Sequence, residues 1–332
     1  MANPAVLCFG EVLFDRIANE PAPTVAAVQS WTAYPGGAPA NVACALAQWG
    51  TPTAFLGCIG PDPAGAELLR VLNQAGVDTH PVQMHPSAPT RQVDVLRDAQ
   101  GDRRFAGFGG RDTNQFADAL CGPAVLDPAL FAAAQFLVVG SLGLAAPITG
   151  ATLRSAYALA QRHQVGIVLD VNWRPMFWPD PRQAPAAVLA LLPQVTVLKV
   201  AVEEADLLFS TQEAAAIQAK FPNLQAILVT NGAKGCHYWI QGYQGFMPAF
   251  KLAVVDTTGA GDGFVAGFVH QLVTQGLPHD AGQAEAMVRF ASAVGGLCAT
   301  QPGAIASQPN LQAVQAVLAP TDSHPPSPSS HD

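Results

Sequence analysis

The stretch Asp256-Thr257-Thr258-Gly259-Ala260-Gly261-Asp262-Gly263-Phe264 decides how the rest of this chain is interpreted. Glycines and other small residues lie between two aspartates, and the apolar residues 264–269 that follow are compatible with a helix. A glycine-rich turn before a helix binds anions, because free backbone N–H groups and the positive end of the helix dipole point at one place. Asp262 falls in the first turn of this helix, where a carboxylate can take a proton from a hydroxyl group that attacks a phosphoryl group. The simpler alternative is that Asp262 only caps the helix.

A second glycine-rich stretch lies much earlier, at Gly36-Gly37-Ala38-Pro39-Ala40-Asn41-Val42-Ala43. The two stretches, in this order, resemble the two signatures of the ribokinase-like carbohydrate kinases, often called the PfkB family. The resemblance extends over roughly residues 5–310. Within the family, the start Gly10-Glu11-Val12-Leu13-Phe14-Asp15 and the stretch Asp170-Val171-Asn172-Trp173-Arg174-Pro175, followed by Trp178, look most like the fructokinases.

The resemblance implies a catalytic apparatus in the first stretch. Asp262 would be the catalytic base. The backbone N–H groups of Gly259, Ala260 and Gly261 would hold the γ-phosphate and stabilise the charge of the transition state. The pattern GxxxxGK[ST] is absent from the sequence, so the chain is not a P-loop enzyme and the anion site must lie in this turn.

The resemblance also implies four residues that bind the substrate. Asp15 and Asn41 would form hydrogen bonds with sugar hydroxyl groups, while Gly36 and Gly37 would let the sugar approach the backbone closely. Taken alone, the glycine pair could be an ordinary turn and Asn41 a helix cap.

The nucleotide-binding residues implied by the resemblance are Asn172, Lys199, Glu204, Thr230, Gly232, Gly235 and Ser292. Lys199 would meet phosphate as a point charge, although a solvated lysine is the simpler alternative. Glu204 would order the magnesium shell, and the asparagine that the family has three residues earlier is Ala201 here. Ser292 would belong to one wall of an apolar adenine pocket.

Many members of the family bind a monovalent cation beside the anion site. The matching positions are Asp256, Thr258, Cys298, Gln301, Gly303 and Ser307, most of which would offer backbone carbonyl oxygens. The resemblance thus implies ATP, Mg²⁺ and potassium as cofactors. We expect potassium to activate the kinase reaction.

The composition limits the kinds of protein that this chain can be. Its 332 residues are 50% hydrophobic and 12% charged, enough to bury a large core. A net charge of −8 without a Lys/Arg cluster argues against nucleic acid as a partner. The sequence shows neither a long apolar run nor a secretory signal, so we expect no membrane association and a cytoplasmic location. The six cysteines have no zinc spacing and are expected to be buried thiols.

Short apolar runs alternate with helix-compatible stretches along the chain. Strands are predicted at 6–9, 54–56, 136–139, 167–169, 197–198 and 227–229, and helices at 40–49, 64–75, 149–163, 183–192, 202–210 and 213–221. This alternation predicts a three-layer, doubly wound α/β fold with a mostly parallel sheet. Ligands bind beyond the carboxyl ends of the strands in such sheets, where Asp170, Lys199 and Thr230 lie.

Two segments do not fit the alternation. Residues 12–35 are extended between proline-rich turns, and residues 90–108 predict a hairpin with its turn at 98–101. By resemblance they form a small β lid over the substrate, beside an α/β kinase core made of residues 1–11, 36–89 and 109–319. The lid is compatible with a homodimer. Residues 320–332 are of low complexity and are expected to be disordered.

Together these features predict an ATP-dependent sugar kinase, with D-fructose as the substrate and fructose 6-phosphate as the product. One alternative is another kinase of the family, acting on ribose, ketodeoxygluconate, a nucleoside or a sugar phosphate. It stays open because Arg91, Arg103, Arg104 and Arg111 could clamp a phosphate group or form a solvated lid edge. A second alternative is a non-catalytic module that senses a sugar or a nucleotide, which only Ala201 supports.

Overall fold

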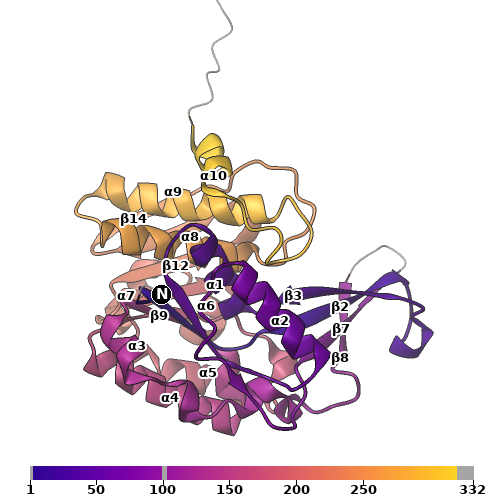
Figure 1. The fold of residues 1–332 in the computed structure, drawn as a ribbon. Coiled ribbons are helices and arrows are strands. Elements are labelled where there is room, and N and C mark those ends of the chain that lie inside the picture. The colour runs from indigo at the N-terminus through magenta and orange to yellow at the C-terminus, as the bar shows by residue number, and fades with distance from the viewer. Residues whose placement is uncertain (1–2, 99–102, 320–332) are drawn as a thin grey trace, which may run out of the picture.

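The computed structural model describes residues 3–98 and 103–319, and its main sheet has eight strands (Figure 1). In spatial order they are β14 (Tyr243–Met247), β13 (Cys236–Ile240), β12 (Ala226–Thr230), β11 (Val197–Ala201), β10 (Gly166–Asp170), β9 (Phe136–Gly140), β1 (Val6–Phe9) and β4 (Thr53–Leu56). The strands from β12 to β4 are parallel, whereas β13 and β14 pair antiparallel at one edge. The predicted mostly parallel sheet is confirmed.

Helices cover both faces of the main sheet (Figure 1). On one face lie α1 (Ala38–Gln48), α2 (Pro63–Gln74), α8 (Ala260–Gln275), α9 (Ala281–Cys298) and α10 (Leu311–Leu318). On the other lie α3 (Pro128–Ala133), α4 (Pro147–Arg162), α5 (Ala184–Leu189), α6 (Val202–Phe209) and α7 (Ala214–Lys220). Side chains alternate between the faces of a strand, so Val6 and Cys8 pack in the first core and Leu7 and Phe9 in the second. The three-layer architecture is therefore confirmed.

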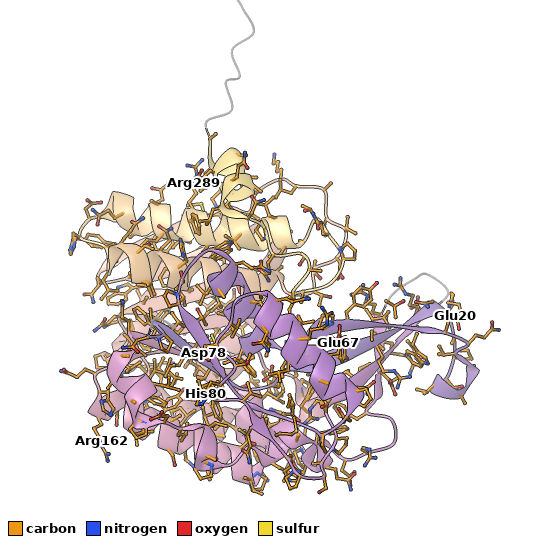
Figure 2. All side chains as sticks on the ribbon, in the orientation of Figure 1. Glu20, Glu67, Asp78, His80, Arg162 and Arg289 are labelled. Carbon is orange, nitrogen blue, oxygen red and sulfur yellow. The ribbon has the colours of Figure 1, made fainter. Side chains whose placement is uncertain are left out.

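A second sheet of four strands projects from one side of the molecule (Figure 1). Its order is β3 (Trp31–Gly36), β2 (Leu13–Pro21), β7 (Gln92–Arg97) and β8 (Arg103–Gly107), and we call it the small sheet. The two segments that were expected to form a lid thus pair with each other, through parallel bonds between β2 and β7. Figure 2 shows Glu20 at the end of this sheet that lies farthest from the helices.

The remaining elements are short. Strands β5 (Cys58–Ile59) and β6 (Gln83–Met84) form a two-stranded sheet. The 3-10 helices are η1 (Val25–Ala27), η2 (Thr113–Gln115), η3 (Ala117–Leu120), η4 (Pro123–Val125), η5 (Leu142–Ala145), η6 (Pro175–Phe177), η7 (Pro181–Gln183), η8 (Leu192–Gln194) and η9 (Gly232–Lys234). Residues 99–101 of the predicted hairpin turn, the following residue 102 and the tail 320–332 lie outside the described residues.

Two local predictions differ from the structure. The helix expected at 183–192 is only the short α5 between two 3-10 turns, because prolines at 181 and 193 restrict the backbone at both ends. The hairpin of β13 and β14 was not predicted. Its two-residue turn has positive φ at Gln241 (51°) and Gly242 (90°), which suits a tight hairpin.

All six cysteines are free and buried, as the sequence predicted. Burial raises the pKa of each thiol, to about 12 for Cys44, Cys58, Cys236 and Cys298. Within the described parts of the chain, His, Cys, Asp and Glu side chains form no group of three or more that could hold a metal ion. None of the described helices combines the length and the apolar character that a membrane span requires.

Candidate active site

A cleft of about 510 Å³ lies between the small sheet and the carboxyl ends of the main-sheet strands. This volume is in the range of small-molecule sites. Apolar side chains of the small sheet line one side, among them Leu13, Val93 and Phe105. Polar groups line the other side, including Asn172, beyond the end of β10, and Lys199 in β11. The cleft is therefore where a doubly wound sheet is expected to bind its ligand.

Residues 259–262, which we call the glycine turn, lead into α8 at the base of the cleft. Gly259 has a φ of 78°, and a Cβ there would lie 2.8 Å from both the Cα and the Cβ of Ala304. Only glycine suits both conditions. The N–H of Ala260 donates to the carbonyl oxygen of Thr257 (3.2 Å) in this structure, and its expected role toward the γ-phosphate stays a prediction. Within the described residues, the N–H groups of Gly261 and Asp262 have no acceptor and remain free for an anion.

Asp262 and Asn41 meet in the cleft, although they come from α8 and α1 at opposite ends of the chain. The Nδ2 of Asn41 donates to the Oδ2 of Asp262 at 2.6 Å. Burial raises the pKa of Asp262, and the charge of Asp170 raises it further, while the hydrogen bond from Asn41 opposes the shift. A carboxylate with a raised pKa and a fixed orientation is suited to accept a proton. The two glycine-rich stretches of the sequence therefore form one site.

Asp15 faces the glycine turn from β2 of the small sheet, across the cleft. Burial raises its pKa to about 6, and the guanidinium of Arg103 opposes this shift. Gly36 lies against Asp15, since a Cβ there would be 3.3 Å from the Asp15 Oδ2. Gly37 has a φ of 107°, and a Cβ there would lie 2.5 Å from the carbonyl oxygen of Glu11. The four predicted substrate-binding residues are thus close together in space.

Glu11 is a buried residue of the cleft that sequence reasoning did not single out. Its Oε1 accepts a hydrogen bond from the N–H of Ala38 (3.0 Å) at the start of α1, the helix that carries Asn41. Burial raises the pKa of Glu11 to about 7. The sequence did contain a signal for Glu11, since it is a carboxylate only two residues beyond the end of β1. The same rule, that polar residues at strand ends are candidate ligand-binding residues, identified Asp170.

Lys199 lies directly beneath the glycine turn. Its Nζ pairs with the Oδ1 of Asp170 at 2.9 Å, and both side chains are buried. Burial lowers the pKa of Lys199, but the charges of Asp170 and Glu204 outweigh it and the pKa is raised. A Cβ on Gly261 would be 3.3 Å from the Nζ. The positive charge therefore supports the anion site from below, and Lys199 is not the solvated lysine of the simpler alternative.

Glu204 is held by the backbone. Its Oε1 accepts from the N–H of Trp173 (2.7 Å) and its Oε2 from the N–H of Ala201 (2.8 Å). The side chain borders the cleft and fixes the loop after β10, where Asn172 has a positive φ of 39°. Its role toward magnesium stays a prediction.

The other expected nucleotide residues lie outside the cleft lining. Thr230 ends β12 and pairs in register with Ala201, one strand farther along the sheet. Gly232 and Gly235 have φ values of 47° and 121°, and a Cβ on Gly235 would clash with the carbonyl oxygen of Met247. Ser292 is half-buried on α9. Their part in nucleotide binding stays a prediction.

Asp256 is the centre of the side-chain contacts among the residues expected around a monovalent cation, and the cation site itself stays a prediction. The carboxylate of Asp256 accepts hydrogen bonds from the N–H and Oγ1 of Thr258 and from the N–H of Gly303. The Sγ of Cys298 instead points to Gln308 (3.4 Å), and the Ser307 Oγ donates to the Ala304 carbonyl oxygen (3.0 Å). Gln301 is exposed.

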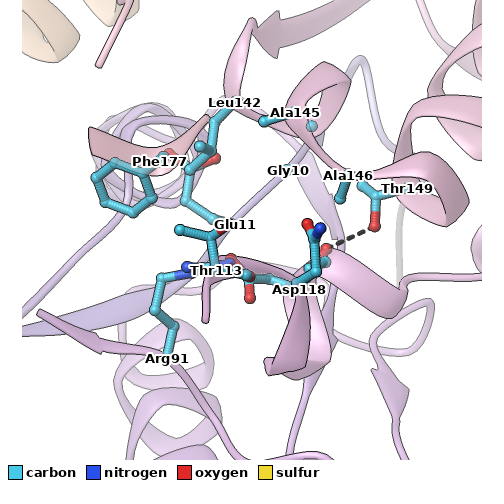
Figure 3. A pocket seen from close by; sticks show the side chains of 13 residues that line it. Gly10, Glu11, Arg91, Thr113, Asp118, Leu142, Ala145, Ala146, Thr149 and Phe177 are labelled. Carbon is cyan, nitrogen blue, oxygen red and sulfur yellow. Dashed lines mark hydrogen bonds and ion pairs between the residues drawn. The ribbon is translucent and has the colours of Figure 1, made fainter. Parts of the chain in front are cut away.

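A second cavity of about 20 Å³, room for a single water molecule, lies behind Glu11 (Figure 3). Arg91 is buried there in an ion pair with Asp118 (2.7 Å) and against the ring of Phe116. The hydroxyl of Thr149 donates to the backbone oxygen of Asp118 (2.7 Å), as the dashed line in Figure 3 marks. Arg91 is therefore a structural residue and is not part of a phosphate clamp.

Comparison with known proteins agrees with this geometry. A sequence profile of the pfkB family carbohydrate kinases matches residues 3–311. Fructokinase-1 of Oryza sativa subsp. japonica is 34% identical over 309 residues, which cover 92% of this chain and 94% of the rice protein.

Two solved structures are similar over nearly the whole chain. The fructokinase of Xylella fastidiosa with bound ATP superposes with a TM-score of 0.83 at 30% identity, covering 94% of this chain and 97% of that one. A double mutant of the fructokinase of Vibrio cholerae O395, bound to fructose, ADP and a potassium ion, superposes with a TM-score of 0.80 at 28% identity, covering 96% and 99%.

Proposed function

Because the chain belongs to the pfkB family of ATP-dependent carbohydrate kinases, we propose that it is a fructokinase, which converts ATP and D-fructose into ADP and fructose 6-phosphate. The observation that carries the proposal is the hydrogen bond between Asn41 and Asp262 beside the free N–H groups of the glycine turn. The fructokinases among its relatives support fructose as the acceptor.

The geometry supports a direct transfer. The sugar lies between Asp15 and Asn41, with its 6-hydroxyl group toward Asp262, which accepts the proton as the oxygen attacks the γ-phosphorus atom. The N–H groups of Gly261 and Asp262 hold the oxygens of the transferring phosphoryl group, and the buried charge of Lys199 stabilises them from below. The apolar underside of the small sheet keeps water from the reacting atoms.

Magnesium would neutralise charge on the phosphate oxygens of ATP when it is bound. Asn172 and Glu204 would hold its water molecules, because carboxylate and amide oxygens suit this ion and both side chains border the cleft. A monovalent cation also stays a prediction, and the side chain expected to bind it, Asp256, is paired with Arg103.

A phosphorylated substrate is less well supported. Of the four arginines that could clamp a phosphate group, Arg91 is buried in its ion pair and Arg104 donates to the carbonyl oxygen of Pro23. Arg103 borders the cleft but is engaged with Asp256, and Arg111 is exposed. These positions favour a neutral sugar.

The test is ADP release from Mg-ATP with a panel of acceptors: D-fructose, ribose, adenosine, ketodeoxygluconate and fructose 6-phosphate. Turnover with fructose at a kcat/KM at least tenfold above every other acceptor is expected. Turnover with a different acceptor would support the kinase reaction but assign another substrate. Nucleotide binding without turnover on any acceptor would overturn the proposal in favour of a sensing module.

A further inference from the structure

An ion pair joins the small sheet to the loop that precedes the glycine turn. Arg103, the first residue of β8, donates from Nη1 to the Oδ1 of Asp256 (2.9 Å) and from Nη2 to its Oδ2 (3.1 Å). The same Nη1 also lies 2.9 Å from the Oγ1 of Thr258. The Asp256 side chain is 7% exposed and that of Arg103 is 32% exposed. Both residues line the cleft, so the pair links its two sides, and it exists only while the small sheet lies against the core.

The Asp256 carboxylate has no free position for another ligand in this arrangement. Its Oδ1 accepts from Arg103 and from both the N–H (3.0 Å) and the Oγ1 (2.7 Å) of Thr258. Its Oδ2 accepts from Arg103 and from the N–H of Gly303 (3.1 Å). A carboxylate offers roughly four lone-pair sites, so these five donors saturate it. The hydrogen bonds from Thr258 and Arg103 also help to keep its pKa below the usual range, against the effect of burial.

The hydrogen-bond donors around the Asp256 carboxylate leave no suitable place for a monovalent cation there. A cation there would meet the guanidinium at short range, and like charges repel strongly in a partly buried site. The positive charge that the resemblance assigned to a potassium ion is present as Arg103.

We infer that the guanidinium of Arg103 takes the place of a monovalent cation beside the anion site, so that this chain works without potassium. Arg103 is a positioning residue: it acts through Asp256, which in turn holds the backbone of Thr258 next to the glycine turn. The inference rests on the proposed kinase function. It also ties the anion site to the sugar side of the cleft, because Arg103 and Asp15 belong to the same small sheet.

The test compares the wild type with Arg103→Gln and with Arg104→Gln. The second variant is a matched control, since it loses the same charge from the same strand, but its arginine contacts Pro23 and not Asp256. Each protein is measured in potassium chloride and in tetramethylammonium chloride at equal ionic strength. The readouts are the Tm without sugar or nucleotide, and kcat/KM for the best acceptor.

The wild type and Arg104→Gln are expected to respond to potassium by less than twofold in kcat/KM and to show no shift in Tm. Arg103→Gln is expected to lose about tenfold or more of kcat/KM in tetramethylammonium, in line with the loss of charge-assisted hydrogen bonds. Potassium should then restore most of that activity and raise its Tm in a saturable way, because a cation that binds the folded state stabilises it.

Two results would overturn the inference. The first is activation or stabilisation of the wild type by potassium, which can be read even if the variant does not fold. The second is an Arg103→Gln variant that is inactive in tetramethylammonium and whose activity and Tm do not change when potassium is added. If the wild type phosphorylates no acceptor, the kinase proposal fails separately, and the Tm measurements still decide whether Arg103 excludes potassium.

Discussion

The glycine turn and the small sheet border the same cleft but are fixed in different ways. The conformation of the glycine turn is fixed by its backbone and by close packing. Gly259 lies against Ala304, and Lys199 is buried beneath the turn. The small sheet contributes apolar side chains and joins the loop before the turn through a partly exposed ion pair between Arg103 and Asp256. Under the proposed function, the closely packed side would carry the chemistry of phosphoryl transfer, and the more exposed side would choose the acceptor. The predictions below test this division.

The largest effect is expected on the closely packed side, from Asp262→Asn. The substitution removes the base but keeps the size of the side chain, so kcat should fall by about 10²–10⁴-fold, the usual contribution of general base catalysis. Steady-state kinetics with Mg-ATP and D-fructose measure it. A loss below about tenfold would mean that Asp262 is only a helix cap.

A change on the small sheet, Asp15→Asn, is expected to act mainly on binding. The loss of a charged hydrogen-bond acceptor for the sugar should raise KM for the acceptor by about 10–100-fold. The kcat at saturating sugar should fall much less than in Asp262→Asn. If kcat fell as far as in that variant while KM stayed constant, the division between chemistry and acceptor choice would be wrong.

Gly259→Ala tests whether the turn depends on close packing. Both the positive φ and the contact with Ala304 oppose a Cβ there, so the variant should lose about 1–3 kcal/mol of unfolding free energy and part of its kcat. Gly50→Ala is the control, because Gly50 has a similar positive φ of 82° but open space around it. Equal losses in urea unfolding of the two variants would show that φ alone matters.

The smallest effect is a shift in the pH profile of Asn41→Ala. The Asn41 amide stabilises the charged form of Asp262 and so lowers its pKa, against the effect of burial. Without that amide the pKa of Asp262 rises further, and more of the base is protonated at a given acidic pH. The acid limb of kcat/KM should therefore move to higher pH, as measured with D-fructose. A shift to lower pH would contradict the assigned contact.

The parts of this molecule that were predictable from the sequence depend on local patterns. Buried strands such as β1 and β12 appear as apolar runs, and the glycine stretches mark turns that few other residues allow. The contacts that could not be predicted join distant segments. Glu11 beneath α1, the occupied N–H of Ala260 and the pairing of Arg103 with Asp256 depend on distances that no spacing encodes. The β13–β14 hairpin was missed because its strands carry mixed polar and apolar residues.

The burial of all six thiols has a practical consequence for observing the small sheet. They lie within the described parts of the chain, and their raised pKa values leave almost no thiolate to react with a maleimide. A cysteine introduced at the exposed Val25, beyond the end of β2, and another at the exposed Ala66 on α2 would therefore be the reactive pair. Two dyes attached there would report in single molecules whether the small sheet moves relative to the core, with every native cysteine left in place.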